Sequence, residues 1–238
     1  MPNARMVSLV ALSLIVGQLI IRGWLVATGN FYWDDLVLLA RASSNPILSW
    51  EYLGHSHDGH FMPAAFLLAG VATWLAPLNW ALPALMLVVM QAIASVAVWR
   101  MVRVIAPRAR IGALVALAFY LFSPMTVPAF AWWAAGLNTL PLQAAMAWIV
   151  ADAVRLARGD VDDARRRLVW VRSTIVFLIA LAFFEKSLFI LPVALVAAVL
   201  ANGGPRATTV TLRSARELWL ALTVAAASWV AVYFVTTD

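Results

Sequence analysis

The stretch VSLVALSLIVGQLIIRGWLVATGNFYWDD, residues 7–35, decides the fold of this chain. Its first part, Val7 to Ala27, is an almost unbroken apolar run, and a helix needs about 20 such residues to cross the hydrocarbon core of a bilayer. The run is too long for the apolar region of a cleavable signal, and no small-x-small cleavage site follows it. It therefore predicts a first membrane-spanning helix, followed by a polar segment that opens on two adjacent aspartates.

Apolar residues dominate the rest of the chain as well. Of its 238 residues, 64% are hydrophobic and 12% are charged, whereas soluble domains average about 45–50% apolar and about 25% charged residues. Such an excess can be buried only against lipid, so the sequence predicts a single all-α, polytopic membrane module over residues 1–238. Seven spans are expected, at roughly 7–28, 82–102, 112–130, 137–154, 168–184, 187–201 and 218–235.

The basic residues are sorted among the loops, and this sorting predicts the orientation. Fourteen of the 17 Lys and Arg residues face the cytoplasm if the run 61–78 lies in the outer interface and Glu185-Lys186 separates two short spans. The positive-inside rule then favours a cytoplasmic N-terminus and a first extracytoplasmic loop, residues 29–81, that contains interfacial helices. Because the basic residues form no single patch, a nucleic-acid partner is excluded. The Arg- and Ala-rich composition favours a bacterial plasma membrane.

Asp34 and Asp35 are the first candidates for chemistry. One of them could simply cap the short helix that begins there. Two adjacent carboxylates just outside a span also repel each other, which raises one pKa, and a carboxylate at a membrane surface can act as a general base on an acceptor hydroxyl. Both readings are open from the residues alone.

All three histidines lie in the polar tract 51–60. His55, His57 and Asp58 have the composition of a site for a divalent metal such as zinc or manganese. The alternative is an irregular polar loop that binds headgroups or caps the next helix. Asp58 and His60 could equally donate or accept hydrogen bonds in a substrate site. Cysteine is absent, which excludes disulfides, thiolate metal sites and cysteine nucleophiles.

Three cations are candidates for holding a phosphate on a lipid-linked substrate. Lys186, the only lysine, follows Glu185 in a tight connection between two short spans; the pair could also be a simple ion pair at a helix end. Arg22 lies within the first span, where it could extend to the interface or face a cavity beneath Asp34. Arg41 lies in the first outer loop.

Three motifs together resemble the GT-C fold glycosyltransferases, which include the protein O-mannosyltransferases and the aminoarabinose transferases. The first is Asp34-Asp35 in the first outer loop, followed by the turn His60-Phe-Met-Pro63. The second is Phe183-Phe-Glu-Lys186 before an apolar Leu-Pro run, and the third is Trp132-Trp-Ala-Ala-Gly-Leu-Asn138, which is similar to the short second outer loop of the superfamily. Each motif is short, but their order and sidedness match over essentially the whole chain.

The resemblance implies a sugar donor carried on polyprenyl phosphate, an extracytoplasmic active site and inversion at the anomeric carbon. It implies that Asp34, with Asp35 beside it, is the base, that Lys186 contacts the lipid phosphate, and that Asn138 lies at the site. Two departures stand out, because the family often has Lys-Glu or Lys-Gly where this chain has Glu185-Lys186, and a basic residue where it has Met62. The acceptor would be a glycan, a lipid or a protein. The resemblance also implies that this chain is the shared N-terminal module, which further spans follow in many members.

Two other functions compete with a transferase. One is a non-catalytic membrane subunit or a degenerate paralogue of such an enzyme. The other is a transporter or flippase for a lipid-linked substrate, although transporters tend to place ionisable groups near the midplane of the membrane, and here the charges gather at the ends of the spans.

Overall fold

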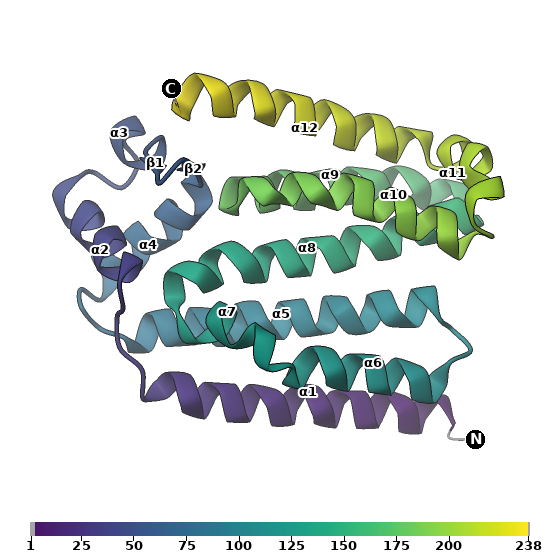
Figure 1. The fold of residues 1–238 in the computed structure, drawn as a ribbon, viewed down its shortest axis with the longest axis horizontal. Coiled ribbons are helices and arrows are strands. Elements are labelled where there is room, and N and C mark those ends of the chain that lie inside the picture. Colours follow the sequence, from purple (N-terminus) through teal and green to yellow (C-terminus); the bar gives the residue numbers. More distant parts are fainter. Residues whose placement is uncertain (1–2, 238) are drawn as a thin grey trace.

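The chain is almost entirely helical. A computed structural model describes residues 3–237, and its long helices lie side by side (Figure 1). They are α1 (Ala4–Ala27), α5 (Ala81–Ile105), α6 (Arg110–Phe122), α8 (Trp133–Arg158), α9 (Asp163–Phe183), α10 (Ile190–Ala201) and α12 (Arg216–Thr237). The all-α prediction is confirmed.

Four helices of the described part are long and apolar enough to cross a membrane: α1, α5, α8 and α12. Two bent pairs raise this number to six if each is one span. The first pair joins α6 to residues 124–131 at 48°, and the second joins residues 185–201 to 205–214 at 106°. Helix α9 corresponds to the predicted span 168–184, but it begins five residues earlier and carries four arginines, Arg165, Arg166, Arg167 and Arg172. Length and composition therefore support four to six spans, and the predicted total of seven stays a prediction.

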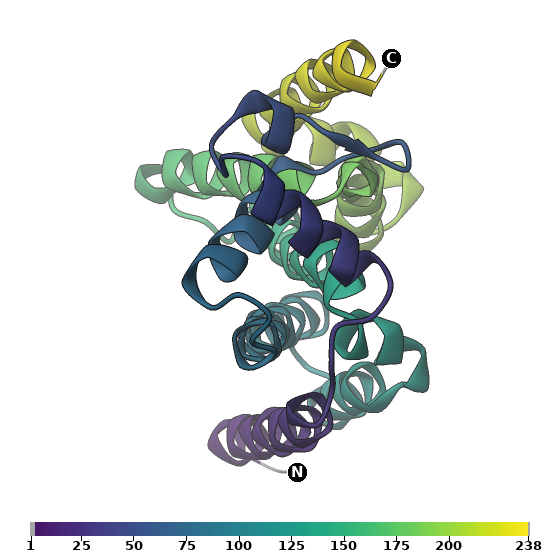
Figure 2. The same ribbon diagram turned by 90° about the vertical axis from the view of Figure 1, so that its left-hand side faces the viewer.

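The connecting segments gather at two opposite ends of the helices. One end, which we call the loop end, holds α2 (Asp34–Ser44), α3 (Trp50–Leu53), the hairpin β1 (Ser56–His57) and β2 (His60–Phe61), α4 (Pro63–Leu75), α7 (Val127–Ala131) and the 3-10 helices η1 (Pro124–Thr126) and η2 (Glu185–Phe189). Figure 2 views this end, where α2 crosses in front of helices seen nearly end-on. The opposite end, which we call the basic end, holds the N-terminus, the α5–α6 and α8–α9 turns, η3 (Pro205–Ala207) and α11 (Thr208–Ser214).

This arrangement explains how the basic residues are sorted. The arginine clusters at 100–110, 155–172 and 206–216 all lie toward the basic end, and Lys186 lies at the loop end. The predicted topology requires this separation. Helix α4 is only 13 residues long and packs against α2 and α3. At about 1.5 Å per residue it is too short to cross a bilayer.

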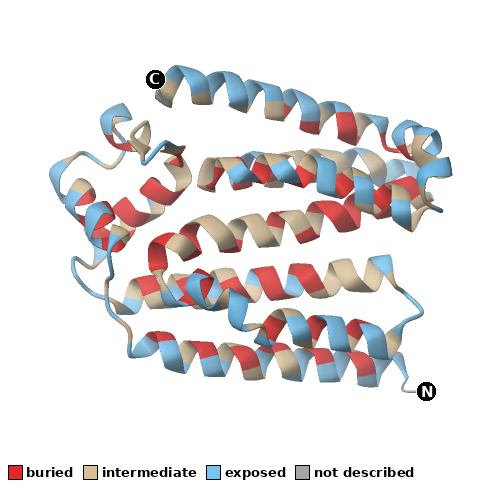
Figure 3. Cartoon of the chain, in the orientation of Figure 1, coloured by how far each residue is buried: buried red, intermediate tan, exposed pale blue. Residues whose placement is uncertain are grey.

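Helix α8 forms the centre of the bundle. It packs against α5, α9 and α10, and its burial contrasts with the exposed outer faces of α1 and α12 (Figure 3). Those outer faces carry large apolar side chains such as Leu9, Ile20, Leu220 and Val224, which are all more than 60% exposed. Apolar surface of this extent is buried only when lipid surrounds the helices. The protein is therefore an integral membrane protein with several apolar helices.

The loop end has a small core of its own. The Tyr52 side chain is fully buried, and its hydroxyl donates a 2.8 Å hydrogen bond to the Phe66 carbonyl oxygen of α4. Burial raises the pKa of Tyr52 to about 12. This contact fixes α3 on α4, and it thereby fixes the start of the hairpin that follows α3.

Candidate functional site

A cavity of about 260 Å³ opens at the loop end. The start of α2, the hairpin β1–β2, the first turns of α8 and the end of α9 enclose it. Its polar lining combines five of the eleven predicted site residues with Thr139, which was not predicted: Asp34, His57, Asp58, His60, Asn138 and Thr139. Residues more than 100 positions apart in the sequence are thus brought together at one site.

The two adjacent aspartates have different surroundings. Asp35 is fully buried, and its Oδ1 accepts a 2.7 Å hydrogen bond from the Ala134 backbone N–H in the first turn of α8. Its Oδ2 accepts a 3.0 Å bond from the Tyr32 N–H. No side chain adjacent in sequence caps α8, so Asp35 satisfies a backbone donor that the helix start leaves unpaired. Burial raises the pKa of Asp35 despite these bonds.

Asp34 faces the cavity instead. Side chains of consecutive helical residues point about 100° apart, so when Asp35 points at α8 its neighbour must point elsewhere. Asp34 lines the cavity, its side chain is 26% exposed, and its Oδ1 lies 3.9 Å from His57 Nε2. Of the two carboxylates predicted as catalytic, Asp34 is therefore the one that a bound molecule can reach.

Two residues beside the cavity have positive φ angles that are unusual for non-glycine residues. Trp33, directly before Asp34, has φ 48°, and Asp58, at the tip of the hairpin, has φ 50°. At Trp33 such a conformation costs on the order of 1–3 kcal/mol and persists where the surrounding structure enforces it. At Asp58 it is the conformation that an Asp-Gly turn favours. Here the hairpin register, with His57 opposite His60, and the turn before α2 hold both histidines and Asp34 at the cavity.

His60 and Glu185 form the second polar group of the site. His60 Nδ1 lies 2.7 Å from Glu185 Oε1, across 125 residues of sequence. Lys186 Nζ lies 4.9 Å from the centroid of the Phe184 ring, and Phe184 itself lines the cavity. Lys186 is exposed and outside the lining residues, so this predicted phosphate-binding residue lies beside the cavity.

Several polar atoms around the cavity are buried without a hydrogen-bond partner among residues 3–237. They are His57 Nε2, Trp132 Nε1, Asn138 Oδ1 and Glu185 Oε2. Buried polar atoms are nearly always paired, and exceptions call for an explanation such as a bound ligand or water. Three of these residues, His57, Trp132 and Asn138, line the cavity, and unpaired donors and acceptors in a cavity wall indicate a site for a polar, hydroxyl-rich molecule.

Two predicted phosphate ligands lie away from this cavity. Arg22 is buried between α1, α5, α6 and α7, where it donates hydrogen bonds to Gln91 Oε1, to Thr126 Oγ1 and, at 3.0 Å, to the Leu121 carbonyl oxygen. Its guanidinium also lies 4.2 Å from the Phe130 ring centroid. The Arg22 guanidinium therefore donates its hydrogen bonds to α5 and to the segment where α6 ends. Arg41, near the end of α2, is also absent from the cavity lining.

The predicted metal ligands are not brought into one group. Among the described residues, no cluster of three or more His, Asp or Glu side chains could hold a metal ion. His55 packs edge-on against Phe66, and its pKa is lowered by burial and then by the nearby positive charge of Arg41. His57 packs edge-on against Phe66 as well and lines the cavity, and Asp58 is exposed at the hairpin tip.

Sequence reasoning missed three contributions to the site. Trp132 and Thr139 line the cavity within or next to the motif 132–138, so that motif could have pointed to them. Tyr233, whose hydroxyl donates a 2.6 Å hydrogen bond to the Gly59 carbonyl oxygen at the hairpin tip, gave no signal, because a tyrosine near the end of an apolar span is an ordinary interfacial residue.

Comparisons with family models, with curated proteins and with solved structures found no match for this chain.

Proposed function

We propose that this chain is a membrane glycosyltransferase, or the catalytic module of one, that transfers a sugar from a polyprenyl phosphate to an acceptor hydroxyl at the loop end. The observation that carries the proposal is the position of Asp34, a partly buried carboxylate that lines a polar cavity beside His57. A carboxylate in such a place can take the proton of a hydroxyl bound next to it. The motif resemblance to GT-C enzymes supplies the donor class.

In the proposed reaction Asp34 is the general base. It removes the proton of the acceptor hydroxyl while the oxygen attacks the anomeric carbon of the sugar from the face opposite the phosphate. The bond from that carbon to the phosphate oxygen breaks, and polyprenyl phosphate leaves with the electron pair. The products are an inverted glycoside, polyprenyl phosphate and a protonated Asp34. His57 Nε2 lies 3.9 Å from Asp34 Oδ1 and lines the same cavity.

We expect Lys186 and His60 to bind the donor. Cations stabilise the negative charge that develops on a leaving phosphate, and Lys186 lies against Phe184 at the cavity wall. The His60–Glu185 pair lies at the same wall. Asn138 and Trp132 offer an amide and an indole N–H to sugar hydroxyls. The loop end faces the extracytoplasmic side in this proposal, because the arginine-rich end then faces the cytoplasm.

Transfer of radiolabelled sugar from polyprenyl phosphate to acceptors in isolated membranes tests the proposal. Membranes with the wild-type chain are expected to transfer sugar, and those without it are not. Lys186→Met should raise the KM for the donor about tenfold, the loss of one charge-assisted contact worth about 1.4 kcal/mol. Arg206→Met, which removes an exposed positive charge at the basic end, is the matched control and should leave the KM unchanged.

Two outcomes would contradict this proposal. Donor binding without transfer would identify a non-catalytic subunit. An unchanged KM in the Lys186→Met variant would remove Lys186 from the donor site.

A further inference from the structure

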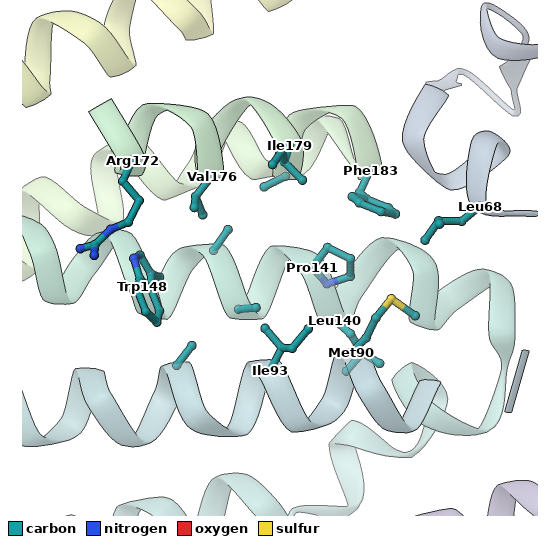
Figure 4. Close-up of a pocket in the computed structure, with 14 residues that line it drawn as sticks. Leu68, Met90, Ile93, Leu140, Pro141, Trp148, Arg172, Val176, Ile179 and Phe183 are labelled. Carbon is teal, nitrogen blue, oxygen red and sulfur yellow. The ribbon is translucent and has the colours of Figure 1, made fainter. Parts of the chain in front are cut away.

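A second and larger cavity lies between the helices, away from Asp34. It is a groove of about 450 Å³ along α5, α8 and α9. Figure 4 shows Leu68 and Phe183 at one end and Trp148 and Arg172 at the other. From Leu140 to Trp148 it follows α8 for about 12 Å, at 1.5 Å per residue. Arg172 is the only ionisable residue among those that line it.

The groove is open to the surroundings of the bundle. Ile93 of α5 and Ile179 of α9 lie on its two sides and are 57% and 52% exposed. In a membrane these residues face lipid, so an acyl chain can enter the groove sideways from the bilayer. A hydrophilic ligand would lose its hydrogen bonds to water against these apolar walls, and that loss costs free energy.

The Arg172 end of the groove carries an excess of positive charge. Asp152 is fully buried, and its Oδ2 accepts hydrogen bonds from Arg172 at 2.6 Å and from Ser173 at 2.9 Å. Its Oδ1 accepts a bond from Arg100 and lies 3.8 Å from Arg155. One carboxylate thus faces three guanidinium groups, which leaves two positive charges unbalanced within this cluster.

Trp148 links this cluster to the groove. Its ring centroid lies 4.4 Å from the Arg100 guanidinium carbon and 5.0 Å from that of Arg172. Trp148 Nε1 and Arg172 Nε are both without a hydrogen-bond partner in the described part of the chain. An anionic group at this end would meet two unpaired donors and the excess charge of the arginines.

An apolar groove that ends in an unpaired guanidinium N–H and an unpaired indole N–H, beside an excess of positive charge, matches an amphiphile with a negative head. We propose that the groove binds one acyl chain of an anionic glycerophospholipid, with the phosphate at Arg172 and Arg100. Basic pockets between membrane helices on the cytoplasmic side recognise such headgroups. This lipid would enter from the leaflet at the basic end, whereas the cavity at Asp34 lies at the loop end, so the inference is independent of the proposed transferase activity.

Photocrosslinking tests the proposal on the full chain in phosphatidylcholine vesicles. The probe is a phosphatidylglycerol that carries a diazirine midway along one acyl chain. Label is expected in the groove segments 90–97 and 176–183, and an excess of unlabelled phosphatidylglycerol should suppress it more than phosphatidylcholine does. Arg172→Gln should reduce this label about fivefold, because one arginine contributes about 1 kcal/mol to the binding of anionic lipid.

Arg167→Gln is the matched control, because Arg167 is an exposed arginine of the same helix. It should leave the label in the groove segments unchanged. Ala144→Phe fills the groove and leaves the arginine cluster intact, so it should remove the label even if the Arg172 variant fails to fold.

Three results would overturn the proposal. The first is equal label in the Arg172 and Arg167 variants, or equal competition by both phospholipids. The second is unchanged label in the Ala144→Phe variant. The third is stronger competition by undecaprenyl phosphate than by phosphatidylglycerol, which would assign the groove to an isoprenoid chain.

Discussion

At the scale of single residues, Asp34 and Asp35 show how neighbouring side chains acquire separate roles. Asp35 accepts backbone hydrogen bonds at the start of α8, and Asp34 lines the cavity. The prediction that one aspartate caps the helix beginning at Asp34 was wrong, because α2 has no side-chain cap. Asp35 bonds the start of α8 instead, and Asp34 is the residue left for the proposed base. The sequence could not separate them, because the partner of Asp35 is Ala134, 99 residues away.

The buried Asp35 makes a testable prediction about pH. Its pKa is raised by burial, so the folded protein binds this proton more tightly than the unfolded chain does. The stability that the group contributes is complete below its unfolded pKa near 3.8 and is lost as the pH rises through the folded pKa. The Tm of the wild type minus the Tm of Asp35→Asn, measured by thermal unfolding, should therefore decrease as the pH rises from 4 to about 8.

The control for this pH series is Glu51→Gln, which removes an exposed carboxylate at the loop end. The Tm difference between the wild type and Glu51→Gln should not show this change with pH. A wild-type advantage over Asp35→Asn that grows with pH would contradict the assigned shift.

At the scale of elements, the bend between α6 and α7 explains why an arginine is buried among apolar helices. Helix α6 ends at Phe122 before Pro124, and its last carbonyl groups lose their helical partners. Arg22 donates to the Leu121 carbonyl oxygen, and the positive guanidinium suits the negative end of the helix dipole. Pro124 and Pro128 made this break predictable from the sequence, but the arginine that stabilises it could equally have faced a substrate.

Arg22→Met should therefore lower stability and leave the chemistry intact. The change strips hydrogen bonds from Gln91, Leu121 and Thr126, and a buried polar group left unpaired costs about 1–3 kcal/mol. We expect a lower Tm in detergent, while sugar transfer per folded molecule stays near that of the wild type. Arg5→Met, an exposed arginine of the same helix, should leave the Tm unchanged. Wild-type stability with lost transfer would instead place Arg22 at the substrate.

The hairpin is the element that the sequence described least well. Its tract was predicted as a loop with a metal-like composition, and the structure gives two short strands with an Asp58-Gly59 turn in which both residues have positive φ. Positive φ at both central positions is what Asp-Gly turns favour. The pairing of His60 with Glu185 depends on contact between distant segments, so no local pattern could predict it.

At the scale of the whole molecule, polar and charged residues are divided between two ends. Apolar runs, prolines and arginine clusters were enough to predict the long helices and the connection at Glu185-Lys186. The interfacial position of α4 stays a prediction. Whether helix α9 spans the membrane is harder to predict, because its first half carries four arginines and its second half is an apolar run. The cavity was only partly predictable, since its residue types were visible in the sequence and their convergence was not.

The orientation of the molecule can be tested directly, because the chain lacks cysteine. Asn30→Cys places a single thiol at the loop end, and Asp160→Cys places one at the basic end; both positions are exposed. A membrane-impermeant maleimide should label Asn30→Cys in intact bacterial cells. It should label Asp160→Cys only after the cells are permeabilised. The opposite pattern would place the candidate site on the cytoplasmic side.

The central claim is that the Asp34 carboxylate takes the acceptor proton. Its most direct test is the single-turnover rate of sugar transfer from bound polyprenyl-phosphate donor by wild type, Asp34→Asn and Glu51→Gln, at equal amounts of folded protein. Asp34→Asn should bind donor normally and transfer it at least about 100-fold more slowly, as the loss of a general base predicts, while Glu51→Gln keeps the wild-type rate. An Asp34→Asn variant that transfers sugar as fast as the wild type would contradict the account.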